Sequence, residues 1–352
     1  MRQPAHGGNL AWAAALAGCP PDAILDFSAS ISPLGPPNSA IAAILSQIGN
    51  LKHYPDPNYS ELRLALSHFH QLPPEWILPG NGSAELLTLI GRELAQLAAT
   101  ILITPAFGDY YRTLKAYNAK VLECPLLLVT GHWSLVIDKG QRTKDKGLLL
   151  NNPHNPSGKL FSRESILPYL EQFALVVVDE AFMDFVPPNE EQSLIPVVQE
   201  YRNLVVLRSL TKFYSLPGLR LGYAIAHPDC LAKWQLWRDP WPVNTLAAAA
   251  AIAALQDTEF QQQTWAWLPP ARNQLFQGLA EIPGLQPQVS AANFLLVESQ
   301  QSTSQLQQQL LQHYQILIRD CLSFKELGDR FFRVAVRSHA DNQRLLTALK
   351  ES

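Results

Sequence analysis

The stretch "NLVVLRSLTKFYSLPGLRLGY" (203–223) places a lysine and an arginine directly after a run that is typical of a buried strand. Lys212 follows Ser209 and Thr211, and Arg220 stands one short loop further on. A lysine amine forms Schiff bases with carbonyls only when it is partly removed from water. Hydroxyl groups and an arginine beside it suit a phosphate. The stretch therefore indicates either a solvated surface lysine or a covalent site for a phosphorylated carbonyl compound.

Composition limits the class of partner. The chain has 352 residues, of which 47% are hydrophobic, and this is enough for a large core. Its 27 basic and 30 acidic residues nearly balance, which disfavours nucleic acid or an anionic membrane as a partner. No apolar stretch approaches the roughly 20 residues of a membrane span. We therefore expect a small-molecule ligand, no nucleic acid and no membrane.

The cysteines indicate a reducing compartment. They lie far apart, without a CxxC pair or a histidine cluster at ligand spacing, at Cys19, Cys124, Cys230 and Cys321. This pattern predicts no metal site, no disulfide framework and a cytoplasmic location. The segment "LAWAAALAGCP" (10–20) also ends like a bacterial lipoprotein signal. Because only Arg2 is basic ahead of it and the apolar core is short, an alanine-rich helix is the favoured interpretation.

Apolar runs rich in β-branched residues alternate with helical patterns along the first two thirds of the chain. The helical patterns include 84–99 and 162–173. The runs show little polar alternation, as expected for strands covered on both faces, and lie at 100–105, 119–125, 147–153, 174–182, 203–210 and 221–228. Alternation of strand and helix predicts an α/β fold with a mostly parallel sheet.

After Asn244 the pattern changes to two helices, a few strands and a closing helix. The predicted helices cover 245–257 and 271–284, and the predicted strands cover 293–299, 316–320 and 330–338. We expect a large domain at 51–244. A smaller α+β domain would combine 1–50 with 245–352, and its N-terminal segment would close over the substrate.

Polar groups stand where several of the predicted strands end, and ligands bind beyond the carboxyl ends of strands in open α/β sheets. Asp179 ends the run "ALVVV" (174–178), and a buried carboxylate needs a partner. "GNGSAEL" (80–86) offers backbone N–H groups for a phosphate, although N-capping by Asn81 or Ser83 explains the same residues. A lysine for an aldehyde, a carboxylate for a ring nitrogen and donors for a phosphate together predict pyridoxal 5′-phosphate.

These residues resemble the fold-type I pyridoxal-phosphate enzymes, the aspartate aminotransferase superfamily. The order of six motifs matches, namely "GNGS" (80–83), "TPAF" (104–107), "NPHNPSG" (152–158), "DEAF" (179–182), "SLTKFYSLPGLRLG" (209–222) and "RVAVR" (333–337). The resemblance implies an α/β fold of this type. Its large domain would hold a mostly parallel seven-stranded sheet between helices, next to a smaller α+β domain.

The resemblance also implies a role for each matching residue. Lys212 would bind the cofactor aldehyde, Asp179 would pair with the pyridinium nitrogen, Asn155 would bond the ring oxygen, and Phe107 would stack on the ring. The phosphate ligands would be Gly82, Ser83, Ser209, Thr211 and Arg220. Tyr54, in "HYPDPN" (53–58), matches a tyrosine that reaches the neighbouring subunit's cofactor. A homodimer follows from that match, whereas a plain turn aromatic is the alternative.

Within the superfamily the chain is most similar to the histidinol-phosphate aminotransferases and to the L-threonine-O-3-phosphate decarboxylases of cobalamin biosynthesis. Stretches such as "AHGGNLAWAA" (5–14) and "LDFSASISPLG" (25–35) are closer to the decarboxylases. Ser30 and Ser32 stand where that pattern has asparagines. Phe182 stands where aminotransferases commonly carry a tyrosine. Decarboxylation is the favoured hypothesis and transamination the alternative.

A decarboxylase must turn its substrate so that the bond to the carboxylate stands upright on the cofactor ring, and a substrate phosphate offers the second anchor for this rotation. The resemblance implies that Arg333 holds the α-carboxylate. Candidates for the remaining substrate contacts are His6, Asn9, Ser32, Gly35, Asn155, Arg319 and Arg337. A frayed chain end would equally explain His6, and solvated strand ends would explain Arg319 and Arg337.

Overall fold

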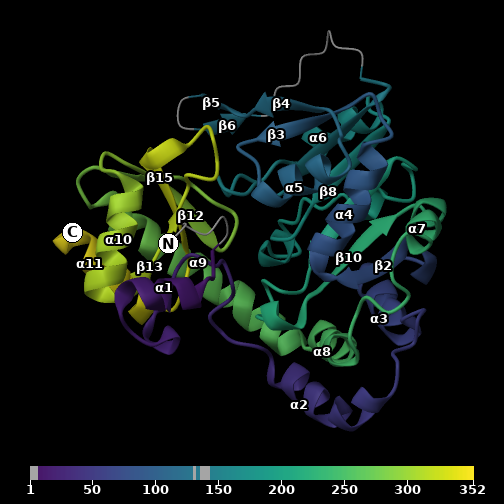
Figure 1. The fold of residues 1–352 in the computed structure, drawn as a ribbon, viewed down its shortest axis with the longest axis horizontal. Coiled ribbons are helices and arrows are strands. Elements are labelled where there is room, and N and C mark those ends of the chain that lie inside the picture. The colour runs from purple at the N-terminus through teal and green to yellow at the C-terminus, as the bar shows by residue number, and fades with distance from the viewer. Residues whose placement is uncertain (1–6, 130–131, 135–142) are drawn as a thin grey trace.

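The computed structural model of the chain describes residues 7–129, 132–134 and 143–352. Figure 1 shows two lobes, each built around its own sheet. The large lobe holds a seven-stranded sheet, and the small lobe holds a four-stranded sheet. Segments from both ends of the chain, purple and yellow in Figure 1, lie together in the small lobe.

The large sheet confirms the predicted α/β fold. Its strands follow the order β2 (Ile77–Asn81), β10 (Leu221–Ala226), β9 (Leu204–Ser209), β8 (Leu175–Asp179), β7 (Lys146–Asn151), β3 (Ala99–Thr104) and β4 (Val121–Pro125). The strands from β9 to β4 pair in parallel. β10 is antiparallel to both of its neighbours. The sheet is therefore mostly parallel, as the sequence pattern predicts.

Burial on both faces explains why the strands show no polar alternation. In β8, Val176 and Val178 belong to one hydrophobic cluster, whereas Leu175 and Val177 belong to another. Successive side chains of a strand point to opposite faces, so both faces of the sheet are covered. Eleven helices surround the sheets, namely α1 (Leu10–Ala17), α2 (Asn38–Gln47), α3 (Ser60–His70), α4 (Gly82–Leu94), α5 (Gly108–Ala116), α6 (Arg163–Leu170), α7 (Pro228–Gln235), α8 (Thr245–Gln256), α9 (Thr258–Ala280), α10 (Thr303–Tyr314) and α11 (His339–Glu351), counted over the described residues.

The small lobe has an antiparallel sheet in the order β11 (Leu285–Pro287), β12 (Phe294–Ser299), β15 (Phe331–Ala335) and β14 (Arg319–Asp320). A separate parallel pair joins β1 (Leu25–Asp26) to β13 (Ile316–Leu317). The predicted strand at 316–320 is thus divided between two sheets. A short antiparallel pair, β5 (Leu127–Val129) and β6 (His132–Ser134), follows β4.

Two elements differ from the sequence prediction. β2 was not predicted, because Pro79 and Gly80 disfavour a strand; it forms an edge of the sheet, where it pairs only with β10. The predicted helix at 271–284 is the second half of α9, which continues through Pro269 and Pro270. Because proline usually interrupts a helix, the sequence pattern predicts that this helix begins only after Pro270.

Helices also join the lobes at the lower edge of the molecule. α2 and α3 both contact α8 there, and Figure 1 shows α2 beneath α8. α1 contacts α10 in the small lobe. Within the described residues, none of the helices combines the length and apolar character that crossing a membrane requires.

The parallel strands bring their carboxyl ends to one edge of the large sheet, and the helices that begin there are packed closely. Gly91 of α4 lies against Thr113 of α5. A Cβ atom at Gly91 would approach Thr113 Oγ1 to 2.5 Å and the Thr113 carbonyl oxygen to 2.7 Å.

We predict that Gly91→Ala lowers the free energy of unfolding by about 1–3 kcal/mol, because the two helices must move apart. Urea denaturation measures this change. Gly49→Ala is the control, since a Cβ atom at Gly49 would meet no atom within 4 Å beyond its chain neighbours and its own helix, and it should change stability by less than about 0.5 kcal/mol. Equal stability of the two variants would contradict close packing of α4 on α5.

Candidate active site

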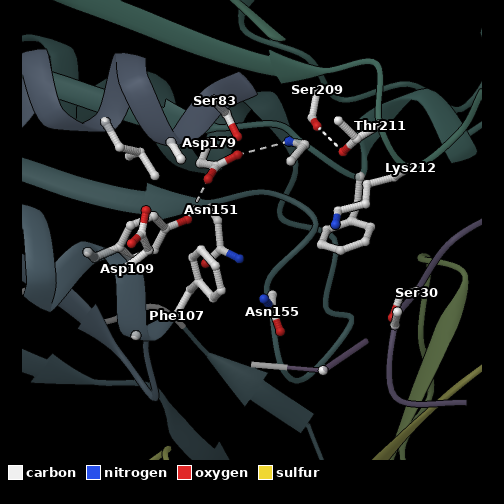
Figure 2. Close-up of a pocket in the computed structure, with 18 of the residues that line it drawn as sticks. Ser30, Ser83, Phe107, Asp109, Asn151, Asn155, Asp179, Ser209, Thr211 and Lys212 are labelled. Atoms are coloured by element: carbon white, nitrogen blue, oxygen red, sulfur yellow. Dashed lines mark hydrogen bonds between the residues drawn. The ribbon is translucent and has the colours of Figure 1, made fainter. Parts of the chain in front are cut away.

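A cavity of about 370 Å³ lies between the lobes, at the carboxyl edge of the large sheet. Phe107 follows β3, Asn151 ends β7, Asp179 ends β8 and Ser209 ends β9; all four line it. The small lobe contributes Arg319, Ser323, Phe324 and Arg333, and the N-terminal segment contributes Gly7 and Ser28 to Ser30. Figure 2 shows the labelled side chains around this shared space.

Lys212 lies in the turn after β9 and points its amine into the cavity (Figure 2). The Ser32 N–H donates to the Lys212 carbonyl oxygen at 3.1 Å, and the Ser215 hydroxyl donates to the Ser32 carbonyl oxygen at 2.7 Å. The N-terminal segment therefore holds the backbone that carries Lys212.

Burial, together with the nearby guanidinium groups of Arg333 and Arg220, lowers the pKa of the Lys212 amine to about 8, whereas Asp179 opposes this change. With a pKa of about 8, roughly a tenth of the amine is neutral at pH 7. A neutral amine is the nucleophilic form. The site thus favours a reactive lysine, and the alternative of a solvated surface lysine does not fit.

Asp179 has a fixed orientation at the end of β8. The Tyr110 hydroxyl donates to Oδ2 at 2.8 Å, and the Ala181 N–H donates to Oδ1 at 3.0 Å. Burial raises the pKa of this carboxyl above its ordinary value, and the two hydrogen bonds and Lys212 oppose this rise without cancelling it. Each oxygen therefore has one donor, which supports the charged form in a dry environment.

A cradle of backbone and hydroxyl groups lies at the start of α4. Gly82 has a φ of 72°, and a Cβ atom there would lie 2.6 Å from Arg220 Nη2. Glycine is required here for both reasons, and it lets the arginine approach the first turn of the helix. Ser83, Ser209 and Thr211 line the same region, where the Ser209 and Thr211 hydroxyls lie 2.8 Å apart.

The small-lobe wall holds two buried arginines. Arg333 Nη1 donates to Asn155 Oδ1 at 2.5 Å, and Nη2 donates to the Ser28 carbonyl oxygen at 3.3 Å. Its buried Nε has no hydrogen-bond partner within the described part of the chain. Burial lowers the pKa of Arg333 to about 10. Arg319 Nη2 donates to Ser323 Oγ at 2.7 Å.

The remaining predicted residues have other surroundings. Asn9 accepts from the Trp12 N–H at 3.0 Å and caps α1. Arg337 pairs with Asp341 at 3.2 Å and donates to the Asp26 carbonyl oxygen. The described predicted residues that do not line the cavity are Asn9, Ser32, Gly35, Tyr54, Gly82 and Arg337, although Gly82 directly precedes the lining residue Ser83. His6 lies outside the described residues.

Several lining residues were not among the predicted ligands. Tyr110 binds Asp179, Asn151 ends β7, and Ser30 has a buried hydroxyl without a hydrogen-bond partner among the described residues. The sequence does draw attention to Ser30, because it stands where the decarboxylase pattern has an asparagine. Tyr110 lies one helical turn after Phe107 in "AFGDY" (106–110). Only the packing of α5 against one face of the large sheet brings its hydroxyl to Asp179.

The residues present fit pyridoxal phosphate. A buried lysine with a lowered pKa suits its aldehyde, the Asp179 carboxylate suits its ring nitrogen, and the Gly82 cradle at a helix N-terminus suits its phosphate. The unpartnered Nε of Arg333 lies on the opposite, small-lobe wall, among the residues that the structure describes. This leaves a separate donor for a second anion.

Comparison with known proteins identifies relatives along nearly the whole chain. A family model described as aminotransferase class I and II matches residues 22–349. The chain is 40% identical to a threonine-phosphate decarboxylase from Salmonella typhimurium, covering 98% of this chain and 96% of that protein. It is 30% identical to an adenosylcobalamin biosynthesis bifunctional protein from Leptospira interrogans, over 99% of this chain and 41% of that protein. The solved histidinol-phosphate aminotransferase from Clostridium acetobutylicum is 28% identical, with a TM-score of 0.82 over 93% of this chain and 98% of that one.

We predict that the apoprotein combines with added pyridoxal phosphate at a rate that rises with pH around a midpoint near 8, because only the neutral amine of Lys212 reacts. Arg333→Met should raise this midpoint by about one unit, since a nearby positive charge is removed. The growth of the visible absorbance band measures the rate.

Lys212→Ala is the negative control and should give no such band. Arg202→Met removes an exposed arginine that pairs with Asp229, and it should leave the midpoint unchanged. If Arg333→Met and Arg202→Met share the wild-type midpoint, Arg333 does not act on the Lys212 amine.

Proposed function

Because the chain belongs to the aminotransferase class I and II family, we propose that it decarboxylates L-threonine O-3-phosphate to (R)-1-amino-2-propanol O-2-phosphate, a reaction of cobalamin biosynthesis. The enzyme depends on pyridoxal 5′-phosphate. The relationship to the Salmonella decarboxylase, which extends over nearly both chains, supports the reaction. The relationship to the bifunctional protein supports the pathway.

The observation that carries the proposal is the pair of buried arginines on the small-lobe wall. Arg319 and Arg333 both line the cavity on the side away from the Gly82 cradle. Arg333 contacts the neutral Asn155 and a carbonyl oxygen, and no carboxylate of the described residues lies within ion-pair distance of it. Buried cations require anionic partners. A substrate carboxylate meets this requirement for Arg333, and the second arginine on the same wall, Arg319, suits a substrate that carries a phosphate as well.

The roles of the residues follow from their positions. The bound cofactor supplies an electron sink for the bond that breaks at Cα. Lys212 holds the attachment point, and its amine, with a pKa of about 8, is suited to return a proton to Cα. Asp179 holds a negative charge where the ring nitrogen would lie, and Tyr110 fixes its orientation. We propose that Arg333 holds the carboxylate and Arg319 the substrate phosphate.

Phe182 favours decarboxylation over transamination. Its ring lines the cavity and contacts Phe294 edge-on, with 5.0 Å between ring centroids. It therefore offers an apolar surface and no hydroxyl beside the reacting atoms. Loss of CO₂ followed by return of a proton leaves the amino group on Cα, so the reaction needs no 2-oxo acid acceptor.

We further propose that two copies form a homodimer through the face of α2 and the following turn. Ile41, Leu45, Ile48 and Leu51 are 41–63% exposed there, and Tyr54 is 81% exposed. Apolar residues gathered in this way indicate an interaction surface. Tyr54 packs against Trp241 with ring centroids 4.6 Å apart, and we propose that it reaches the cofactor phosphate of the second copy.

The two lobes support the proposed domains, 51–244 and 1–50 with 245–352. Gly7 and Ser28 line the cavity, which agrees with an N-terminal segment that closes over the substrate. The four cysteines are free, in keeping with a cytoplasmic location.

We predict that the purified holoenzyme releases CO₂ from O-phospho-L-threonine without any added 2-oxo acid. Trapped ¹⁴CO₂ from carboxyl-labelled substrate measures this directly. L-Threonine should react at least about a hundredfold more slowly, because the second anion is missing. Formation of glutamate from 2-oxoglutarate with histidinol phosphate, without CO₂ release, would instead support histidinol-phosphate transamination.

We predict that Leu51→Asp converts the dimer to a monomer, because a charge would be buried between two copies. Sedimentation velocity measures the change. Val289→Asp is the matched control, since Val289 is 74% exposed on the small lobe and lies outside the proposed interface. A dimer that survives Leu51→Asp would contradict this surface.

A further inference from the structure

Three side chains outside the cavity connect the two lobes. Glu123 lies on β4, Tyr111 lies on α5, and Lys325 lies between β14 and β15. Lys325 Nζ is 3.2 Å from Glu123 Oε1, and the Tyr111 hydroxyl donates to the same oxygen at 2.9 Å. Lys325 Nζ also lies over the Tyr111 ring, 5.0 Å from its centroid. We call these three residues the interlobe bridge.

In each lobe, a residue of the interlobe bridge directly follows residues that line the cavity. Tyr111 directly follows Asp109 and Tyr110, which line the cavity from the large lobe. Lys325 directly follows Ser323 and Phe324, which line it from the small lobe. In Figure 1, the yellow segment before β15 lies on the side of the small lobe that faces β4. A contact between the lobes at this point therefore affects the positions of the residues that line the cavity.

Ser323 links the interlobe bridge to an arginine of the site. Its hydroxyl accepts a hydrogen bond from Arg319 Nη2 at 2.7 Å. Phe324 anchors the same segment in a small cluster with Leu296, Cys321 and Leu327. Movement of the segment 321–327 away from the large lobe would therefore carry Ser323 with it and change the surroundings of Arg319.

The chemistry of the interlobe bridge suits a contact that forms and breaks. The hydrogen bonds from Tyr111 and Lys325 lower the pKa of Glu123, so its carboxylate is charged at neutral pH. Lys325 and Glu123 remain 71% and 41% exposed. Exposed ion pairs are weak and screened by salt, and the stacked aromatic ring adds a further modest attraction.

We propose that Lys325, Glu123 and Tyr111 are positioning residues that hold the segment 321–327, with Ser323 and Arg319, against the large lobe when an anionic substrate occupies the cavity. The contact favours the arrangement in which the two lobes enclose the substrate. Its loss is then expected to weaken substrate binding more than turnover at saturation. The kinetic consequence rests on the proposed decarboxylase function, whereas the contact itself is testable without substrate.

Steady-state kinetics with O-phospho-L-threonine test the kinetic consequence. Lys325→Met should raise KM about two- to fivefold with little change in kcat, and Lys325→Arg should restore the wild-type value. At 0.5 M NaCl the difference between Lys325→Met and wild type should shrink, because salt screens the ion pair. Arg330→Met is the matched control, since Arg330 pairs with Glu298 at 3.0 Å within the small lobe, and it should leave KM unchanged.

Glu123→Gln distinguishes two explanations of a change in KM: loss of the interlobe bridge, and long-range attraction of an anionic substrate by positive charge. Removing this negative charge makes the surroundings more positive, so long-range attraction alone would lower KM. Loss of the interlobe bridge instead raises KM. The Glu123→Gln/Lys325→Met double variant should resemble either single variant, because both remove the same contact.

Hydrogen exchange of the holoenzyme tests the contact without substrate. The amides of Phe324 and Leu327 donate to carbonyl oxygens within the segment, at 2.9 Å and 3.0 Å. Lys325→Met should speed exchange in peptides that cover 321–328 about two- to fivefold, and Arg330→Met should not. Equal exchange in wild type and Lys325→Met, or a KM increase of the same size in Arg330→Met, would overturn the proposal. Failure of the wild type to release CO₂ would refute the decarboxylase function and leave the exchange result to decide on the interlobe bridge.

Discussion

The ion pair between Arg208 and Glu180 is the constraint on which the active site depends. Arg208 Nε lies 3.0 Å from Glu180 Oε2, and both side chains are almost completely buried. Asp179 and Glu180 are adjacent at the end of β8, as Arg208 and Ser209 are at the end of β9. Successive side chains of a strand point to opposite faces. Asp179 and Ser209 therefore face the cavity, while their neighbours Glu180 and Arg208 face each other in the ion pair.

The ion pair has further partners that fix the loop after β8. Arg208 Nη2 lies 2.5 Å from Glu191 Oε1, Nη1 pairs with Asp184, and the Leu194 N–H donates to Glu180. Burial raises the pKa of Glu180 to about 7. Removing Arg208 would leave these carboxylates without their shared cation, at a cost of about 3–5 kcal/mol. The ends of β8 and β9 are therefore held in register, and Asp179 keeps a fixed place relative to Ser209 and the turn of Lys212.

The sequence allowed prediction of those site residues that lie directly after a strand. Asp179 and Ser209 end apolar runs, and Lys212 follows in the next turn, so local pattern was sufficient to find them. Tyr110 and Ser30 reach the cavity only through the docking of α5 and the N-terminal segment, which no local pattern encodes. Lys325 and Glu123 are 202 residues apart in the chain, and neither carries a local signal. Ser32 shows the same limit, because its backbone binds the Lys212 carbonyl oxygen and its side chain does not line the cavity.

Which bond of the substrate breaks depends on where its anionic groups are held. A single guanidinium fixes a carboxylate but leaves the substrate free to rotate about that contact, whereas two separated cations fix its orientation. Arg333 lies against Asn155, which places it close to the large-lobe wall. Arg319 is bound to Ser323 in a segment that the interlobe bridge holds from outside. Specificity for a doubly anionic substrate would therefore arise from the relative position of the two lobes, because Arg333 alone offers the same ligand to a carboxylate in either reaction.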